Sequence, residues 1–141
     1  MKKITYSVSR QSITDLTPEA EAFVAGMNLK NGAVVLETSS STACLFRLDA
    51  QIDSARFVQD LFQEMTNIVP SRITFSSIES PATTAGMLKG AIFGRTLTVL
   101  VEDGALVFPG KIWLVDFCAP KDVTVALGAF CENGGVEDGN R

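Results

Sequence analysis

The sequence predicts an α+β domain in which antiparallel or mixed β-sheets form a sandwich-like core with two main helices. Two helical patterns lie in the first half of the chain, and four short apolar strand patterns follow one another near its end. No glycine-rich phosphate-binding loop follows a predicted strand, and β-α-β units are few, which argues against a parallel doubly wound fold. The 141 residues are enough to bury one core without disulfides or metals.

One domain is expected over residues 1–131. The final residues, 132–141, are rich in glycine and acidic side chains, which is typical of a disordered tail. Three cysteines at wide spacing indicate reduced thiols, and they match neither a disulfide framework nor a zinc pattern. Cys44 and Cys118 lie in apolar strand patterns, so we expect both thiols in the core.

The first 28 residues predict a strand pair and a helix. Polar and apolar residues alternate over 2–9, and residues 12–16 form a second short strand pattern, so we expect the two to pair antiparallel. Thr17 suits the N-cap of the following helix, and Pro18 suits its first position. This helix should end near residues 26–28.

Five consecutive hydroxyl residues, Thr38 to Thr42, separate two predicted strands over 33–36 and 43–48. An amphipathic helix follows, and Asp49 or Asp53 is placed to cap its N-terminus. The apolar residues of this helix recur at three- and four-residue steps; they are Ile52, Ala55, Val58, Leu61, Phe62 and Met65.

The second half of the chain begins with a polar stretch, residues 71–84, which predicts a long surface loop around one short strand. Residues 85–93 predict a short helix that Gly94 stops, with Gly90 marking a close backbone approach. Asp103–Gly104 predicts a hairpin. Four closing strands are expected at 96–101, 105–108, 112–117 and 123–127.

The composition excludes several functions. The chain contains no histidine, so Ser-His and Cys-His nucleophile pairs and imidazole metal centres are impossible. A net charge of −4 without a concentrated basic face argues against nucleic-acid binding. No stretch approaches the roughly 18 apolar residues of a membrane span, and the N-terminus alternates like a strand and not like a signal peptide. A cytoplasmic protein without a membrane role is therefore expected.

The stretches Ser40–Asp49 and Met87–Gly94, together with the hairpin Val99–Leu106, resemble the YjbQ family, also called secondary thiamine-phosphate synthases. The resemblance extends over nearly the whole chain. It implies a compact α+β subunit that assembles as a homotrimer and has a pocket lined by histidines and carboxylates. The activity it implies is condensation of a pyrimidine pyrophosphate with a thiazole phosphate to give thiamine phosphate.

Position by position, this sequence departs from the family where the chemistry lies. The family's first histidine, its asparagine, its acidic residue and its second histidine fall at Ser40, Leu48, Asp49 and Met87. Only Asp49 keeps the family's side-chain chemistry. Lys89, Gly94 and Asp116–Phe117 match the family's lysine, glycine and closing Glu-Phe, whereas its Trp-Gln segment is missing. The scaffold is therefore better preserved than the site.

The candidate catalytic residues are Asp49 and Lys89, and the candidate ligand-binding residues are Ser40, Ser41, Thr42, Met87, Lys89 and Asp116. The hydroxyls either donate to a phosphate or carboxylate, or satisfy local backbone groups. Lys89 is either a phosphate-binding group or an exposed lysine on a short helix. Asp49 is either a site carboxylate or a helix N-cap, and Asp116 suits an edge or surface role.

These residues predict a YjbQ-like protein whose degenerate site binds a small anionic, phosphate-bearing ligand. Thiamine-phosphate synthase activity should be absent or very weak, because general acid–base catalysis alone contributes about 100- to 10,000-fold. The alternatives are an enzyme with an altered mechanism and a structural or protein-interaction trimer, so whether the protein is an enzyme stays open. No cofactor is predicted, although magnesium between Asp49 and Asp116 remains an alternative.

Overall fold

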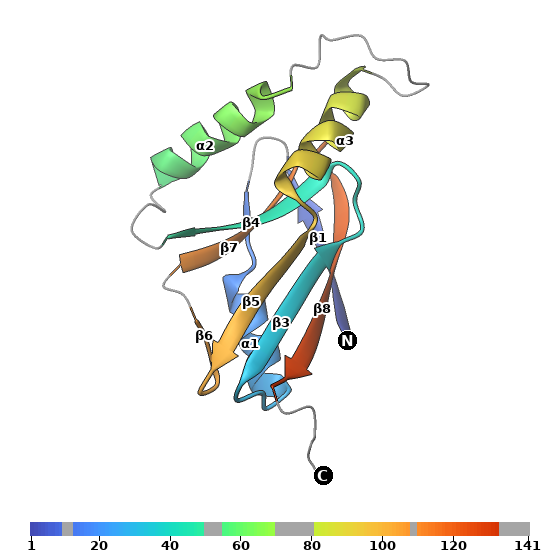
Figure 1. Cartoon of the computed structure of the whole chain (residues 1–141). Helices are drawn as coiled ribbons and strands as arrows, with labels where there is room; N and C mark the ends of the chain where they lie inside the picture. Colours follow the sequence, from blue (N-terminus) through green and yellow to red (C-terminus); the bar gives the residue numbers. More distant parts are fainter. Residues whose placement is uncertain (10–12, 50–54, 70–80, 108–109, 133–141) are drawn as a thin grey trace.

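The computed structural model describes residues 1–9, 13–49, 55–69, 81–107 and 110–132. Within these residues the chain forms three helices and eight strands, and the strands make two antiparallel sheets (Figure 1). The predicted α+β class with a sandwich-like core is confirmed. The predicted tail lies outside the described residues from position 133 onward.

The larger sheet has five strands in the order β1-β8-β3-β5-β6. Asp103 and Gly104 join β5 to β6 with φ angles of 52° and 81°, the left-handed conformation that a two-residue hairpin turn requires. The predicted hairpin is therefore confirmed. The five strands are β1 (Lys2–Val8), β3 (Gly32–Thr38), β5 (Thr96–Glu102), β6 (Ala105–Leu106) and β8 (Lys121–Cys131).

The smaller sheet has three strands in the order β2-β7-β4, namely β2 (Thr14–Asp15), β7 (Gly110–Asp116) and β4 (Ala43–Asp49). The predicted pairing of the first two strands is wrong, because β1 pairs with β8 and β2 pairs with β7. Alternation of polar and apolar residues indicates a strand but not its partner. Both partners lie in the last third of the chain.

Helix α1 (Thr17–Gly26) lies behind β3 and β5 in Figure 1. The predicted N-cap role of Thr17 is wrong, because Leu16 occupies the cap position and no side chain caps it. The Thr17 hydroxyl instead accepts the backbone N–H of Ile112 at 2.8 Å, while the Asp15 carboxylate accepts the N–H of Thr17 at 2.9 Å. The hydroxyl therefore ties the start of α1 to β7.

The main core fills the space between the two sheets and α1, and a smaller cluster lies on the other face of β4 and β7 under α2. Both are built from alternate strand residues, as the two-residue period of a strand requires. The main core includes Leu16, Phe23, Val34, Leu36, Leu45, Val99, Ile112, Leu114, Val125 and Leu127. The smaller cluster contains Cys44, Phe62, Met65 and Val115.

Helices α2 (Ala55–Asn67) and α3 (Pro81–Phe93) lie above β4 in the view of Figure 1. The predicted apolar face of α2 is confirmed at Phe62 and Met65, whereas Ile52 and Asp53 lie outside the described residues. Helix α3 starts four residues earlier than predicted, because Pro81 suits a first helical position, so part of the predicted loop is helical. No helix among the described residues is long and apolar enough to cross a membrane.

The contact between α3 and the start of β4 depends on Gly90. A Cβ atom there would lie 2.8 Å from the carbonyl oxygen of Ser41 and 2.9 Å from that of Ala43, so the backbone of the β4 region or of α3 would have to shift. Gly90→Ala should therefore destabilise the protein by about 1–3 kcal/mol in chemical denaturation.

Gly26 provides the matched control, because a Cβ at this helical glycine meets nothing within 4 Å. Gly26→Ala should be stabilising by about 0.5–1 kcal/mol. Equal effects of the two substitutions would contradict the tight approach at Gly90.

Candidate functional site

A buried carboxylate, that of Asp116, lies at the end of β7 on the face that points between the two sheets. Asp116 pairs with Ala43 in the β4–β7 ladder and shares this face with Leu114 and Leu45. Its side chain is 0 % exposed. The expected edge or surface role of Asp116 is therefore wrong. A buried charge of this kind is costly unless donors surround it.

Three donors satisfy this carboxylate. The Thr42 hydroxyl donates to Oδ1 at 2.7 Å, and the Ser40 hydroxyl donates to Oδ2 at 2.6 Å. The backbone N–H of Cys118 also donates to Oδ1, at 2.8 Å. A hydroxyl carries one proton, so Ser40 and Thr42 have none left for a ligand or for each other. Toward a ligand, these two hydroxyls can therefore act only as hydrogen-bond acceptors.

The hydroxyl turn, Thr38 to Thr42, is folded by its own side chains. Thr38 Oγ1 accepts the N–H of Ser40 at 3.2 Å, and Ser40 Oγ accepts the N–H of Thr42 at 3.3 Å. Serine and threonine side chains in turns commonly form such hydrogen bonds with the backbone N–H two residues further along the chain. The local interpretation of the hydroxyls is thus correct for Thr38, while Ser40 and Thr42 serve both the turn and Asp116. Ser41 is exposed.

Lys121 supplies the positive charge of the site, and sequence reasoning missed it. Its Nζ donates to Thr42 Oγ1 at 3.1 Å and lies 3.8 Å from Asp116 Oδ2. The lysine is the first residue of β8, whereas Asp116 ends β7. Their short separation in sequence, around the β7–β8 turn, was the signal that could have revealed the pair. Its side chain is 36 % exposed.

Helix α3 covers this cluster through a glycine. A Cβ at Gly86 would lie 2.8 Å from Cys118 Sγ and 3.3 Å from the Thr42 side chain. The Cys118 thiol donates to the carbonyl of Ala82 at 3.7 Å, also on α3. Cys118 follows the end of β7 and is partly exposed, so its expected place in the core is wrong, whereas Cys44 is buried as predicted.

Lys89 has a different environment from the one expected. The residue is 4 % exposed, and its Nζ donates to the Thr66 carbonyl at 2.9 Å, in the last turn of α2. The ammonium also lies 4.9 Å from the centroid of the Phe117 ring. A cation at a helix C-terminus is a stabilising arrangement. Burial lowers the pKa of Lys89, and the nearby Cys118 opposes this shift. The alternative of an exposed lysine is wrong.

The structure does not bring Asp49 to this cluster. Asp49 pairs with Gly110 at one end of the β4–β7 ladder, and Asp116 lies at the other end. Six strand steps separate the two ends, or about 20 Å. Within one chain, Asp49 and Asp116 are therefore too far apart to share a magnesium ion. Among the described residues there is no group of three or more cysteine, aspartate and glutamate side chains placed to hold a metal.

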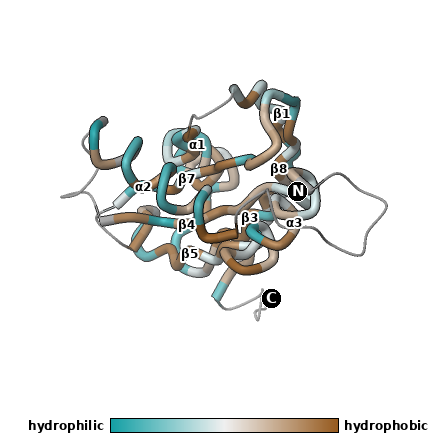
Figure 2. The backbone as a smooth tube through the Cα atoms, turned by 90° about the horizontal axis from the view of Figure 1, so that it is seen from above, coloured by the Kyte–Doolittle hydropathy of each residue, from teal (hydrophilic) through white to brown (hydrophobic). Residues whose placement is uncertain are grey.

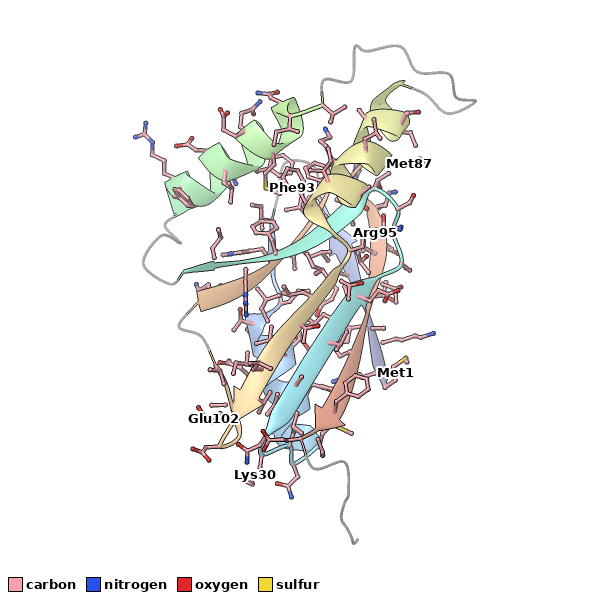
Figure 3. All side chains as sticks on the ribbon, viewed as in Figure 1. Met1, Lys30, Met87, Phe93, Arg95 and Glu102 are labelled. Atoms are coloured by element: carbon pink, nitrogen blue, oxygen red, sulfur yellow. The ribbon has the colours of Figure 1, made fainter. Side chains whose placement is uncertain are left out.

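Met87 and Lys89 do not share one site. They are two positions apart on α3, which places them on roughly opposite sides of the helix. Met87 is 40 % exposed and Figure 3 shows it on α3, whereas Lys89 faces α2. The candidate residues that the structure brings together are Ser40, Thr42 and Asp116, joined by Lys121.

A family model described as UPF0047 protein YjbQ-like matches residues 2–130. An uncharacterised YjbQ/UPF0047 protein from Clostridium acetobutylicum has 16% identity and a TM-score of 0.83, covering 92% of this chain and 100% of its own. A hypothetical protein from Aeropyrum pernix K1 has 18% identity and a TM-score of 0.83, and the match covers 93% of this chain and 98% of that protein. A YbjQ-like protein of unknown function from Sulfolobus solfataricus P2 has 21% identity and a TM-score of 0.78, and the match covers 90% of this chain and 95% of that protein. No curated protein matches the chain.

Removing the Thr42 hydroxyl tests the buried network. Thr42→Val keeps the side-chain shape but leaves Asp116 Oδ1 with only the N–H of Cys118. We expect a loss of about 1–3 kcal/mol in the free energy of unfolding. The control is Thr98→Val on the exposed side of β5, which should change stability by less than about 0.5 kcal/mol. Equal stability of both variants would show that the network contributes nothing.

The buried thiol of Cys44 predicts a pH effect. Burial raises the pKa of Cys44 to about 12 from an ordinary 9.0, and the charge of Asp116 adds to this shift. The folded state therefore holds this proton more tightly than the unfolded state does. The resulting stability is present in full below pH 9 and is lost as pH rises from 9 to about 12.

Denaturation curves across that pH range measure this effect. Cys44→Ala should lose stability less steeply with rising pH than the parent protein, and Cys131→Ala, which changes an exposed thiol, should keep the parent slope. An unchanged slope in Cys44→Ala would contradict the assignment.

Proposed function

The chain belongs to the UPF0047 YjbQ-like family, and we propose that it is a member with absent or very weak thiamine-phosphate synthase activity that binds a small phosphate-bearing anion. The observation that carries this proposal is the closed network around Asp116. Its hydroxyl donors are engaged by the carboxylate itself, and one cation, Lys121, remains at the rim.

The weak activity follows from the side chains at the family's histidine positions. The resemblance places one histidine at Ser40, whose hydroxyl proton is committed to Asp116. It places the other at Met87, whose thioether transfers no proton. General acid–base steps contribute about 100- to 10,000-fold to a typical enzyme, and neither Ser40 nor Met87 supplies such a step here.

Anion binding rests on Lys121 and not on Lys89. The Lys89 ammonium is buried against Phe117 and the end of α2, so an anion reaches it only by unpacking the helices. The Lys121 side chain is 36 % exposed, and its Nζ contacts Thr42, the residue after the exposed Ser41. The charge of Asp116, 3.8 Å from that ammonium, opposes an incoming anion. The expected affinity is therefore weak.

An altered-mechanism enzyme that uses Asp49 and Lys89 together has less support. Asp49 lies at the end of β4 far from Asp116, whereas Lys89 packs on Phe117, the residue after Asp116. The homotrimer implied by the resemblance is also part of our proposal. Exposed apolar side chains on α3 and on the larger sheet support association with further copies of the chain.

Inorganic pyrophosphate is a direct probe of the proposed site. It should raise the melting temperature of the purified protein, because a ligand that binds only the native state stabilises it. Lys121→Met should remove this ligand-induced rise, and Lys30→Met, which removes an exposed lysine elsewhere, should keep it. The rise is compared within each variant, so a change in its basal stability does not affect the outcome.

The same preparations, given the pyrimidine pyrophosphate and the thiazole phosphate, should form little or no thiamine phosphate. Robust turnover would overturn the proposed loss of activity. If pyrophosphate does not raise the melting temperature of the parent protein, the anion-binding proposal is overturned. If the rise is retained in Lys121→Met, the anion does not bind at the Asp116 cluster.

A further inference from the structure

The outer face of the larger sheet carries a hollow that the proposed function does not use. Figure 2 shows β1, β8, β3 and β5 next to one another with α1 on one side of them, and the outer face is the opposite one. The floor of this hollow is Ala126 and Gly128, and its walls include Lys3, Glu37 and Phe130; we call it the β8 hollow. Its volume is about 380 Å³. Ligand pockets have volumes of about 300–1,000 Å³, so the β8 hollow has room for one small molecule.

The strand register places two opposite charges on either side of the floor. Ala126 on β8 pairs with Lys3 on β1 and with Glu37 on β3. Residues that oppose each other across a ladder point to the same face of the sheet, so the three side chains stand in one row. Two strand spacings, or about 10 Å, separate the Cα atoms of Lys3 and Glu37. Because the residue between them is only an alanine, both charged side chains border an open floor.

These two charges are not a cross-strand pair. Opposite charges that stabilise a sheet lie on adjacent strands with Cβ atoms about 5 Å apart, whereas β8 lies between Lys3 and Glu37. In the described part of the chain, neither residue forms an ion pair. Glu37 Oε1 accepts the hydroxyl of Thr96 at 3.4 Å, and Thr96 lies on β5, beyond β3 from the hollow. A simple anion would be attracted by Lys3 and repelled by Glu37, and a simple cation the reverse. A molecule that carries both charges complements both walls.

An aromatic ring lies beside the other half of the floor. A Cβ atom at Gly128 would lie 3.8 Å from Cε2 of Phe130, so the ring reaches alongside the glycine, which leaves space next to it. Phe130 is 61 % exposed, and Val35 pairs with Gly128 from β3. Gly128 is two residues from Ala126, or about 7 Å along β8. An apolar group that extends this far from the charged row meets an aromatic surface, and aromatic rings pack favourably against one another.

We propose that the β8 hollow binds a free α-amino acid with an aromatic side chain. The ammonium and the carboxylate of such a molecule are attached to one carbon, so they reach Glu37 and Lys3 from a position above Ala126. The side chain leaves the same carbon in a third direction and extends along β8 toward Gly128 and Phe130. Each of the three groups then meets a complementary part of the lining. Lys121 does not line this hollow, so the proposal is independent of the anion binding proposed above.

Calorimetric titration of the purified protein with three related compounds tests this assignment. L-Phenylalanine carries both charges, its amide lacks the carboxylate, and N-acetyl-L-phenylalanine lacks the ammonium. L-Phenylalanine should bind about tenfold more tightly than either derivative, because each derivative loses one charge-assisted contact. No binding of L-phenylalanine to the parent protein would overturn the proposal. Equal binding of the three compounds would overturn it as well, because an unspecific apolar surface does not distinguish them.

Two substitutions assign each charge to its wall. In Lys3→Met the amino acid should bind no better than its amide, and in Glu37→Gln it should bind no better than its N-acetyl derivative, because the wall that distinguished them has lost its charge. Lys2→Met and Glu102→Gln are the matched controls. Lys2 pairs with the buried Leu127 and points to the other face of the sheet, and Glu102 lies at the far end of β5. Both controls should keep the tenfold preferences of the parent protein.

Gly128→Val tests the floor. Its side chain occupies the space beside the Phe130 ring and should abolish the binding of L-phenylalanine, while its Cβ makes only an ordinary 3.8 Å contact. Melting temperatures close to the parent's show that each variant is folded. Preferences that persist in Lys3→Met and Glu37→Gln, or binding that survives Gly128→Val, would show that the amino acid binds elsewhere and would overturn the β8 hollow as its site.

Discussion

The buried charge of Asp116 is the constraint on which the rest of this structure depends. A carboxylate with no exposed surface must be surrounded by donors, and here the donors come from the two connections between the sheets, β3–β4 and β7–β8. Ser40 and Thr42 belong to the turn that carries the chain from the larger sheet to the smaller one, while Lys121 begins β8 of the larger sheet. The carboxylate therefore joins the sheets at the same edge where α3 packs.

Packing of α3 on this edge explains why the cluster resembles a site and yet is closed. Gly86 and Gly90 allow the helix backbone to approach the hydroxyl turn closely, which shields Thr42 and leaves Lys121 as the partly exposed charge. Hydroxyl protons that satisfy a buried carboxylate are not available for substrate chemistry. The same close approach leaves apolar residues exposed on the other side of α3.

Most elements could be predicted because their signals are local. Asp103–Gly104 specified a hairpin by itself, and the apolar spacing of α2 indicated which face is buried. The pairing of β1 with β2 failed because alternation contains no information about a distant partner. The predicted N-cap role of Thr17 is not observed, because its hydroxyl accepts a hydrogen bond from the backbone of Ile112, which is distant in sequence. The buried position of Lys89 could not be predicted, because its contacts with Thr66 and Phe117 form only in the tertiary structure.

The sequence by itself determined the α+β class, the positions of most strands and helices, the family resemblance and the absence of imidazole chemistry. These properties depend on composition and on patterns within a few residues. Only the tertiary structure decided that Asp116 is buried, that Lys121 accompanies it, and that Asp49 lies at the far end of the ladder. Burial and charge pairing depend on segments that meet only when the sheets assemble, so a one-dimensional pattern could place the candidate residues in the chain but could not show which of them share a site.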